Sequence, residues 1–353
     1  MVRLYPIRIV QLTCSVRAAN CAIDNRDPAM MRYLTNIFGS IMCAAALLCS
    51  IGCTEKRPTR IAVIPETTAE EIWESEHAGV EETALPLHWD IYWNGPSRED
   101  DITRQIQLVD HAIDNGAQGL ILSPDHAFSL IDPVRAALLK GIPTVILGTP
   151  LAMPSSSKLV FILNDDQAGG RLAATRASLY LKPGDAVAVL GVDPNLLGSI
   201  DRADAFERVI RQKDPQVKIV EERSTSFSVA EAEETAEEVI RSEPNLRVIL
   251  TLNVNQSRGA YQAWSQAGAS NHIKLIGYDQ DLDLMNHLRA GDIDALVAEN
   301  TFQMGADAVQ SLQDQMLGRS SSTRILEKPV LVTRDNADSE PVQHLLDMNW
   351  TRQ

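Results

Sequence analysis

Residues 91–122 read IYWNGPSREDDITRQIQLVDHAIDNGAQGLIL, and they carry the clearest signal of the fold class. Two short apolar runs, 91–93 and 120–122, have the length and composition of buried strands. Between them, apolar side chains recur at the spacing of one helix face: Ile102, Ile106, Val109 and Ile113. Ser97 can cap the start of this helix and Gly116 its end. The stretch therefore predicts a strand, a crossover helix and a second, parallel strand.

The same alternation of strand and helix continues along the chain in two series. The first series has apolar runs at 61–64, 91–93, 120–122, 144–147 and 159–163. The second has them at 186–190, 217–220, 248–252, 273–276 and 293–297. Together they cover more chain than one hydrophobic core usually spans, so we predict an α/β protein of two similar lobes with parallel sheets.

Residues 30–53, MMRYLTNIFGSIMCAAALLCSIGC, have the layout of an export signal. A basic residue precedes an apolar run that is shorter than the roughly 20 residues of a membrane span, and small residues precede Cys53. This ending resembles the lipobox of bacterial lipoproteins, with Ser50 in place of the usual leucine. We predict a signal peptide at 30–52, a lipidated Cys53 and a tether to residue 58; secretion without lipid and an uncleaved tether are the alternatives.

Residues 1–29 precede the paired methionines Met30 and Met31 and have no continuous apolar run, so we interpret them as a non-native or disordered leader. Without residues 1–52, which hold five basic and two acidic residues, 27 basic residues face 45 acidic ones, a formal charge near −18. Such a surface disfavours nucleic acid and anionic lipid as partners. Of the five cysteines only Cys53 follows the predicted cleavage point, which excludes a disulfide within the mature chain.

Sequence motifs of catalysis and of metal binding do not occur. The chain has no phosphate-binding loop, no dinucleotide fingerprint and no nucleophile elbow. Its seven histidines are scattered without the spacing of a zinc site. We therefore expect no cofactor, no metal and no enzymatic activity.

Eight segments in order carry a family resemblance, which runs from about residue 60 to 333. They are RIAVIPETTAEEIWESEHAGVEE (60–82), GAQGLILSPDHA (116–127), GIPTVILGT (141–149), NDDQAGGRLAA (164–174), GSIDRADAFERVI (198–210), VILTLNVNQSRGAYQA (248–263), IKLIGYDQDLDLM (273–285) and AENTFQMGADAV (298–309). This order and spacing resembles the periplasmic ribose-binding protein family, the type I periplasmic binding proteins. The resemblance implies two Rossmann-like lobes joined by a three-strand hinge, with sugar bound between them.

The resemblance also implies where the lobes begin and end. The first would take residues 59–163 and 300–325, and the second 164–299 and 326–335, with a final strand near 325–332. A helix would cross back after Glu299, and the spacing of apolar side chains supports it: Phe302, Ala306, Val309, Leu312 and Met316. Residues 336–353 form a C-terminal tail without interpretation.

Two strand ends match the family's polar contacts to sugar. Asn253 corresponds to an asparagine whose amide can donate to and accept from hydroxyl groups. Asp279 corresponds to an aspartate that accepts hydroxyl hydrogen bonds. The alternative roles are a turn-forming residue for Asn253 and a helix cap for Asp279.

Two charged residues are assigned to the same pocket. Arg202 matches an arginine whose planar guanidinium can bridge two oxygens; its alternative role is an ion pair with Asp201 or Asp204. Glu299 stands where the family commonly has glutamine, which adds charge to the pocket; its alternative role is a solvated hinge residue. With Glu299 facing the ligand, a plain ribose pocket is disfavoured.

Aromatic side chains pack against the C–H faces of sugars. Trp73 falls at a stacking position of the first lobe and Phe227 near one of the second, and Glu70 at a polar contact position. Trp73 could instead face the core, and Glu70 could be solvated surface. The family's aspartate and arginine after the fourth strand are replaced by Gly148 and Thr149, so the sugar cannot be named from the resemblance.

The resemblance and the export signal together predict a monomeric, lipid-anchored solute-binding protein on the periplasmic side of the envelope, which delivers a carbohydrate or polyol to a membrane permease of the ABC type. The alternative is a sensory lipoprotein that signals to a membrane kinase or receptor. A transcription regulator shares the fold but needs a DNA-binding motif where the export signal stands.

Overall fold

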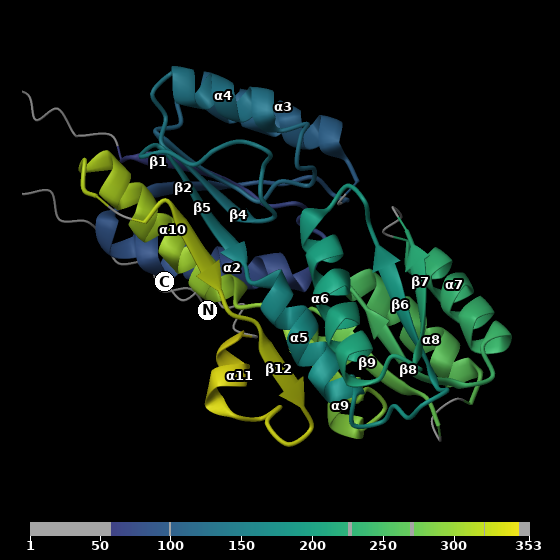
Figure 1. Cartoon of the computed structure of the whole chain (residues 1–353). Coiled ribbons are helices and arrows are strands. Elements are labelled where there is room, and N and C mark those ends of the chain that lie inside the picture. Colours follow the sequence, from purple (N-terminus) through teal and green to yellow (C-terminus); the bar gives the residue numbers. More distant parts are fainter. Residues whose placement is uncertain (1–57, 99, 225–227, 269–271, 321, 346–353) are drawn as a thin grey trace, which may run out of the picture. The chain divides into compact units, whose positions relative to one another are not determined.

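The computed structural model describes residues 58–98, 100–224, 228–268, 272–320 and 322–345, which form two α/β lobes (Figure 1). Each lobe is built on a six-stranded sheet. The predicted fold class is therefore confirmed. The predicted signal segment, Cys53 and Phe227 lie outside the described residues. Within the described part of the chain, no helix combines the length and apolar character needed to cross a membrane.

The first lobe has an all-parallel sheet in the order β11-β5-β4-β3-β1-β2. Its strands are β1 (Arg60–Ile64), β2 (Asp90–Trp93), β3 (Gly119–Leu122), β4 (Thr144–Gly148), β5 (Leu159–Asn164) and β11 (Arg324–Glu327). Its helices are α2 (Glu71–Ala84), the short η1 (Leu85–Leu87), α3 (Ile102–Asp114), α4 (Ile131–Leu139) and α10 (Thr301–Met316).

Helices cover both faces of this sheet (Figure 1). Leu108, Val109 and Val134 from α3 and α4 pack on one face, and Val80, Val309 and Leu312 from α2 and α10 on the other. The residue ranges 61–64 and 120–122 are buried on both sides, as expected for strands between two helical layers.

The second lobe has the sheet order β12-β10-β9-β8-β6-β7, in which only β12 runs antiparallel, to β10. Its strands are β6 (Ala186–Val192), β7 (Lys218–Arg223), β8 (Leu246–Thr251), β9 (Lys274–Tyr278), β10 (Ala295–Ala298) and β12 (Val330–Thr333). Its helices are α5 (Asp166–Ala177), α6 (Leu197–Lys213), α7 (Val229–Ser242), α8 (Val254–Gln266), α9 (Leu282–Ala290) and α11 (Glu340–Leu345).

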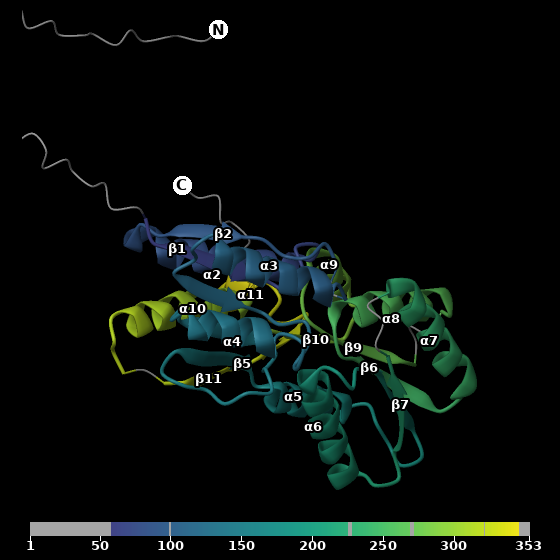
Figure 2. The ribbon, with the colours of Figure 1, turned by 90° about the horizontal axis from the view of Figure 1, so that it is seen from above.

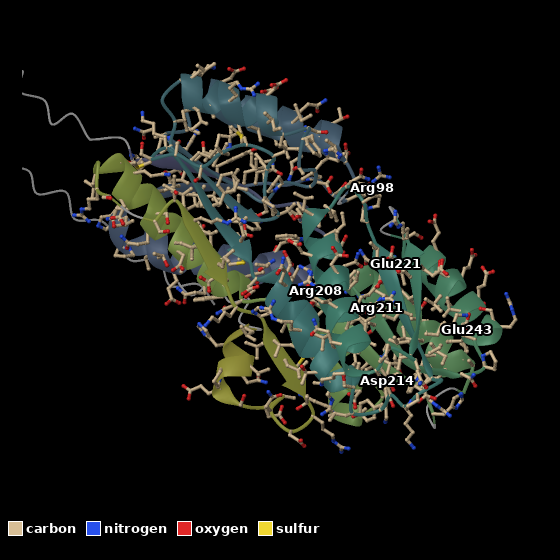
Figure 3. The ribbon with its side chains drawn as sticks, viewed as in Figure 1. Arg98, Arg208, Arg211, Asp214, Glu221 and Glu243 are labelled. Atoms are coloured by element: carbon tan, nitrogen blue, oxygen red, sulfur yellow. The ribbon has the colours of Figure 1, made fainter. Side chains whose placement is uncertain are left out.

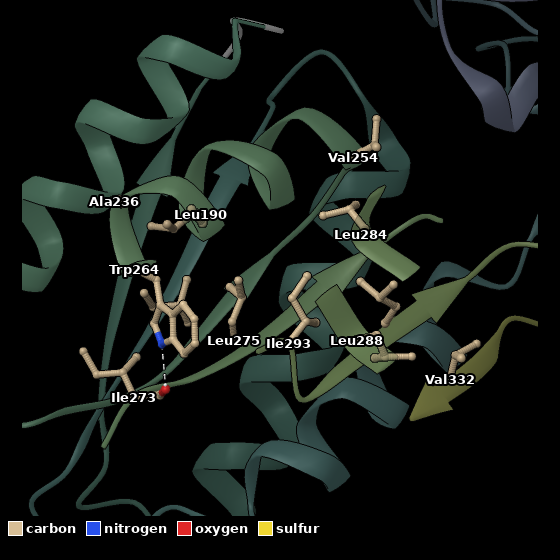
Figure 4. Packing of buried hydrophobic residues seen from close by; sticks show 14 of the residues in the cluster. Leu190, Ala236, Val254, Trp264, Ile273, Leu275, Leu284, Leu288, Ile293 and Val332 are labelled. Atoms are coloured by element: carbon tan, nitrogen blue, oxygen red, sulfur yellow. Dashed lines mark hydrogen bonds between the residues drawn. The ribbon is translucent and has the colours of Figure 1, made fainter. Parts of the chain in front are cut away.

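This sheet too is covered on both faces: α5 and α6 lie on one side, and α7, α8 and α9 on the other (Figure 2). On the second side, Leu275, Leu288 and Ile293 belong to one buried cluster with Trp264 (Figure 4). The indole nitrogen of Trp264 donates a hydrogen bond to the Ile273 carbonyl oxygen at 2.9 Å, which satisfies its polar atom inside an apolar cluster (Figure 4).

The chain passes between the lobes three times: from β5 to α5, from β10 to α10, and from β11 to β12. The third crossing corrects one expectation, because the final strand near 325–332 is two strands in different sheets. Glu327 pairs with Asn164 in the first sheet, and Val330 pairs with Ala298 in the second. Pro329 stands between them and has no backbone N–H to continue either ladder.

Two local features also differ from expectation. The Asp101 side chain, not Ser97, caps α3, since its Oδ1 accepts from the Arg104 backbone N–H at 3.0 Å. Part of the C-terminal tail is ordered as α11, whose Leu345 is buried in the second lobe's core. The Ser75 hydroxyl of the first lobe donates to the Leu345 carbonyl oxygen at 3.2 Å, so this segment contacts both lobes.

Candidate functional site

A cavity of about 80 Å³ lies between the lobes at the carboxyl ends of both sheets, and we call it the central cavity. Its walls are Glu66, Glu70, Ile72, Trp73, Glu76, Gly148, Thr149, Asn164, Leu196, Gly198, Ser199, Arg202, Leu252, Asn253, Val254, Asp279, Glu299, Thr301 and Met304. One water needs roughly 10–15 Å³ measured in this way, so the cavity has room for several waters. Its size suits one small polar molecule.

Six of the seven predicted ligand-binding residues line the central cavity: Glu70, Trp73, Arg202, Asn253, Asp279 and Glu299. Gly148 and Thr149, where the family's anchoring pair is missing, also line it. The structure thus brings the predicted residues together from distant parts of the chain, and their contact with a ligand stays a prediction.

Asp279 follows β9 and has φ 64°, one of two non-glycine residues in the left-handed region among those that the structure describes. Such a backbone costs about 1–3 kcal/mol and persists where the surroundings hold it. The Oδ1 atom is buried, makes no hydrogen bond and lies 3.7 Å from Arg202 Nη1. The helix-cap role belongs instead to Asp281, whose Oδ1 accepts from the Leu284 backbone N–H at 2.6 Å.

Arg202, on α6, is held by groups on three other segments. Its Nε donates to Asp166 Oδ1 at 2.7 Å, its Nη1 to the Leu252 carbonyl oxygen at 2.9 Å, and its Nη2 to Glu299. The guanidinium also lies over the Tyr278 ring, 4.6 Å from the centroid. Burial lowers its pKa, but the surrounding carboxylates outweigh this and raise the pKa well above its ordinary value.

These contacts change the interpretation of Arg202. The ion pairs exist, but with Asp166 and Glu299 rather than with the expected Asp201 or Asp204. Three of the five guanidinium N–H groups are used within the protein, which leaves two for a ligand.

Glu299 marks the crossing from β10 to α10 and is buried, with 8% of its surface exposed, so it is not a solvated hinge residue. Burial raises the pKa of its carboxyl and Arg202 opposes the rise. The Gln280 side chain fixes the backbone on both sides: its Nε2 donates to the Glu299 carbonyl oxygen at 2.8 Å, and its Oε1 accepts from the Glu299 N–H at 3.0 Å.

Asn253 precedes α8 and caps it, because its Oδ1 accepts from the Gln256 backbone N–H at 2.8 Å. The helix-capping use of the oxygen leaves the amide N–H groups to donate into the central cavity. Asn253 thus combines its alternative local role with a place in the cavity wall.

Glu70 and Trp73 bring the first lobe's α2 to the cavity. Trp73 is 8% exposed, and its indole N–H finds no hydrogen-bond acceptor in the described part of the chain. Glu70 Oε1 accepts a hydrogen bond from Asn255 Nδ2 of the second lobe at 2.7 Å. Neither side chain is buried in a lobe's hydrophobic cluster, so both are available to the cavity.

Two acidic residues of the wall were not predicted, Glu66 and Glu76. Glu66 comes two residues after β1, as Asn253 comes two residues after β8, so its position at a strand end could have predicted it. Glu76 shares a helix face with Ile72, Trp73 and Val80, where a charged residue is unexpected. It is 1% exposed, accepts from the Ser123 hydroxyl at 3.0 Å through Oε2, and has no hydrogen bond at Oε1.

Burial dominates the electrostatics of these acids. It raises the pKa of Glu76 to about 8 against the opposing Ser123 hydrogen bond. It also raises the pKa of Glu66 well above its ordinary value, and neighbouring carboxylates raise it further. For Asp279, burial raises the pKa well above its ordinary value, the Glu299 charge adds to the rise and Arg202 opposes it.

Two sheets with helices on both faces and a polar cavity at their carboxyl ends define a two-lobed binding protein. The chain belongs to the periplasmic binding protein domain family, whose model matches residues 61–320. The predicted ribose-binding-protein-like resemblance is confirmed. The D-allose-binding periplasmic protein of Escherichia coli K12 is 25% identical, over 72% of this chain and 83% of its own length. The D-apiose import binding protein of Paraburkholderia graminis is 28% identical, over 68% and 76%.

Solved structures show the same fold. An ABC transporter solute-binding protein from Agrobacterium vitis with bound D-fucose has a TM-score of 0.76 at 24% identity, covering 81% of this chain and 99% of that one. A periplasmic solute-binding protein from Actinobacillus succinogenes with bound D-allose has a TM-score of 0.73 at 22% identity, covering 80% and 99%. Both are sugar-bound transport proteins by their descriptions.

Proposed function

We propose that this chain is a lipid-anchored solute-binding protein of the periplasm that binds a carbohydrate or polyol in the central cavity and delivers it to an ABC-type permease. The observation that carries the proposal is the set of six predicted contact residues around one interlobe cavity. Its relatives are named as sugar- and polyol-binding proteins, among them a xylitol-binding protein of Mycolicibacterium smegmatis.

Binding by this mechanism needs no bond to form or break. A ligand that touches Glu70 or Trp73 in the first lobe and Asp279 in the second favours the closed arrangement by the difference of its affinity for the closed and open states. The carboxylate and amide groups of the wall accept from and donate to hydroxyl groups, and Trp73 offers an apolar ring. The permease would then recognise the closed form.

The membrane anchor is proposed from Cys53 and the apolar run before it. Its test is the mass and location of the exported protein: lipidation at Cys53 adds acyl mass to the first mature residue and places the chain in the membrane fraction. The Cys53→Ala variant should lose the acyl mass. An unmodified cysteine in a fully soluble wild-type protein would remove the anchor from the proposal and leave sugar binding intact.

Ligand binding is tested by thermal unfolding of the purified full chain with pentoses, hexoses, amino sugars, polyols and nucleosides. A ligand at about 1,000 times its dissociation constant adds about 4 kcal/mol to the stability of the folded state, which raises the midpoint by several degrees. A shift with one class names the ligand class. No shift with any compound, at concentrations that saturate millimolar sites, would contradict a carbohydrate-binding function.

A further inference from the structure

The wall of the central cavity is strongly acidic. It contains five carboxyl side chains, Glu66, Glu70, Glu76, Asp279 and Glu299, and one basic side chain among the described residues, Arg202. The next arginines of α6, Arg208 and Arg211, are exposed and do not line the cavity (Figure 3).

Arg202 does not neutralise this wall. Its guanidinium is already paired with Asp166, which lies behind the wall, and with Glu299. The single positive charge of Arg202 is therefore already shared between two carboxylates, and none of it is left to balance the other acids of the wall. Glu66, Glu70 and Glu76 from the first lobe have no ion-pair partner among the described residues, and Asp279 Oδ1 is 3.7 Å from the guanidinium without a hydrogen bond.

Buried polar atoms without hydrogen bonds are independent evidence that the wall needs a partner from the ligand. Asp279 Oδ1, Glu76 Oε1 and Trp73 Nε1 are buried and make no hydrogen bond, and all three residues line the cavity with at most 8% of their surface exposed. A buried polar atom without a partner destabilises the folded protein, and the effect is larger for a charged group. When ionised, the two carboxyl groups can only accept, so a partner that donates hydrogen bonds and carries a positive charge satisfies both oxygens and displaces the protons that burial lets these groups keep.

The carboxylates do not form a metal site. Among the described residues no three acidic, histidine or cysteine side chains converge closely enough to hold a metal ion. They surround the cavity from both lobes instead, and they act on one another electrostatically: the charges of Glu70 and Glu76 raise the pKa of Glu66, and Glu70 also raises that of Asp279. Carboxyl groups spread around a cavity in this way suit an extended organic cation better than a single metal ion.

We infer that the ligand of the central cavity is a polyhydroxylated molecule that carries a positively charged amino group, an amino sugar rather than a neutral sugar. The inference rests on the proposed function and narrows it to a substrate class. The ammonium group supplies three hydrogen-bond donors for the acidic wall. Its positive charge also offsets the electrostatic repulsion among the buried carboxylates, which a neutral sugar would not reduce. The Trp73 ring adds the aromatic surface that attracts both C–H faces and cations.

The test compares matched compounds on the purified full chain by calorimetry and thermal unfolding. D-Glucosamine, D-galactosamine and D-mannosamine are each measured beside their N-acetyl derivative and parent hexose, which remove the charge while keeping the ring. We expect at least one amine to bind about tenfold or more tightly than both of its neutral counterparts. Binding should also release protons, seen as a heat that depends on the buffer.

Variants locate the effect. Glu70→Gln and Asp279→Asn should each lower the affinity for the amine about tenfold. The ratio of the affinity for the amine to that for the parent hexose should also become smaller. Glu237→Gln, an exposed acid of α7, is the matched control and should change neither. If Asp279→Asn does not fold, Glu70→Gln decides alone.

The two proposals fail differently. A parent hexose or pentose that binds as tightly as the amines, with affinities unchanged in Glu70→Gln, overturns the amino-sugar inference and supports the proposed carbohydrate function. Absence of binding by every amine, N-acetyl compound, neutral sugar and polyol overturns both.

Discussion

The side-chain amide of Asn255, in the first turn of α8, donates a hydrogen bond to Glu70 Oε1, 2.7 Å away at the start of α2, and so joins the two lobes. Glu70 lines the central cavity and also a more open cavity of about 500 Å³, whose wall includes Asn255, Arg258 and Arg98. The bond therefore lies where the two cavities meet, and it exists only while the lobes are together.

Replacing Asn255 with alanine should weaken ligand binding by destabilising the closed arrangement. A hydrogen bond to a charged group contributes about 1.5 kcal/mol or more, so we expect a loss of about tenfold in affinity. Calorimetric titration with the ligand identified above measures it. Asn245→Ala removes an exposed amide of the second lobe and serves as the control. Equal affinities for wild type and Asn255→Ala would show that the Asn255–Glu70 bond does not contribute to closure.

The buried carboxyl of Glu76 should make the unliganded protein less stable as pH rises. Its pKa is raised from 4.5 to about 8 by burial, so between these values the folded state keeps a proton that the unfolded state has lost. The stability that this group contributes is complete below about pH 4.5 and is lost as pH rises through 8.

Denaturant unfolding between pH 5 and 9 measures this dependence, and Glu76→Gln should flatten it and raise stability at pH 8. Glu82→Gln, an exposed residue of the same helix, should leave the slope unchanged. A slope that persists in Glu76→Gln would assign the effect to other buried acids, among them Asp125, Glu66 and Asp279, whose pKa values burial also raises.

The segment around α11 should stabilise the chain by packing on both lobes. Val342 and Leu345 are buried in the second lobe's core, and Ser75 of the first lobe bonds the Leu345 carbonyl. Leu345→Ala should cost about 2–5 kcal/mol of unfolding free energy, as for other buried leucines. Gln343→Ala, an exposed change in the same helix, should cost less than about 1.5 kcal/mol, the value of one hydrogen bond. Similar losses in both variants would mean that α11 packs loosely.

Local patterns predicted most of the fold because strands and helices leave a periodic signal in the residues that form them. Residues 91–122 show it clearly, and they form β2, α3 and β3. The two short strands at 324–333 were merged because their division depends on which sheet each joins, and the residues between them give only Pro329 as a sign. A six-residue helix such as α11 is too short for periodicity to reveal it.

The site residues that could be predicted from their position in the fold are those that follow strands, because strand ends face the cavity. Asp279, Asn253 and Glu299 follow strands, and all three line the central cavity. The partners of Arg202 were not predictable, because Asp166 and Glu299 lie 36 and 97 residues away and meet it only through the packing of the second lobe. Acidity of the wall as a whole likewise becomes visible only when both lobes contribute to one cavity.

Asp279 offers a way to separate backbone strain from ligand contact. Its φ of 64° suits glycine but strains alanine, whereas both replacements remove the buried carboxylate. We expect Asp279→Gly and Asp279→Ala to lose ligand affinity equally, by more than about tenfold, because each lacks the charged acceptor. The unfolding free energy should differ by about 1 kcal/mol or more in favour of glycine. Calorimetry and denaturant unfolding of the two variants give both values, and normal ligand binding by either would show that the Asp279 carboxylate does not contact the ligand.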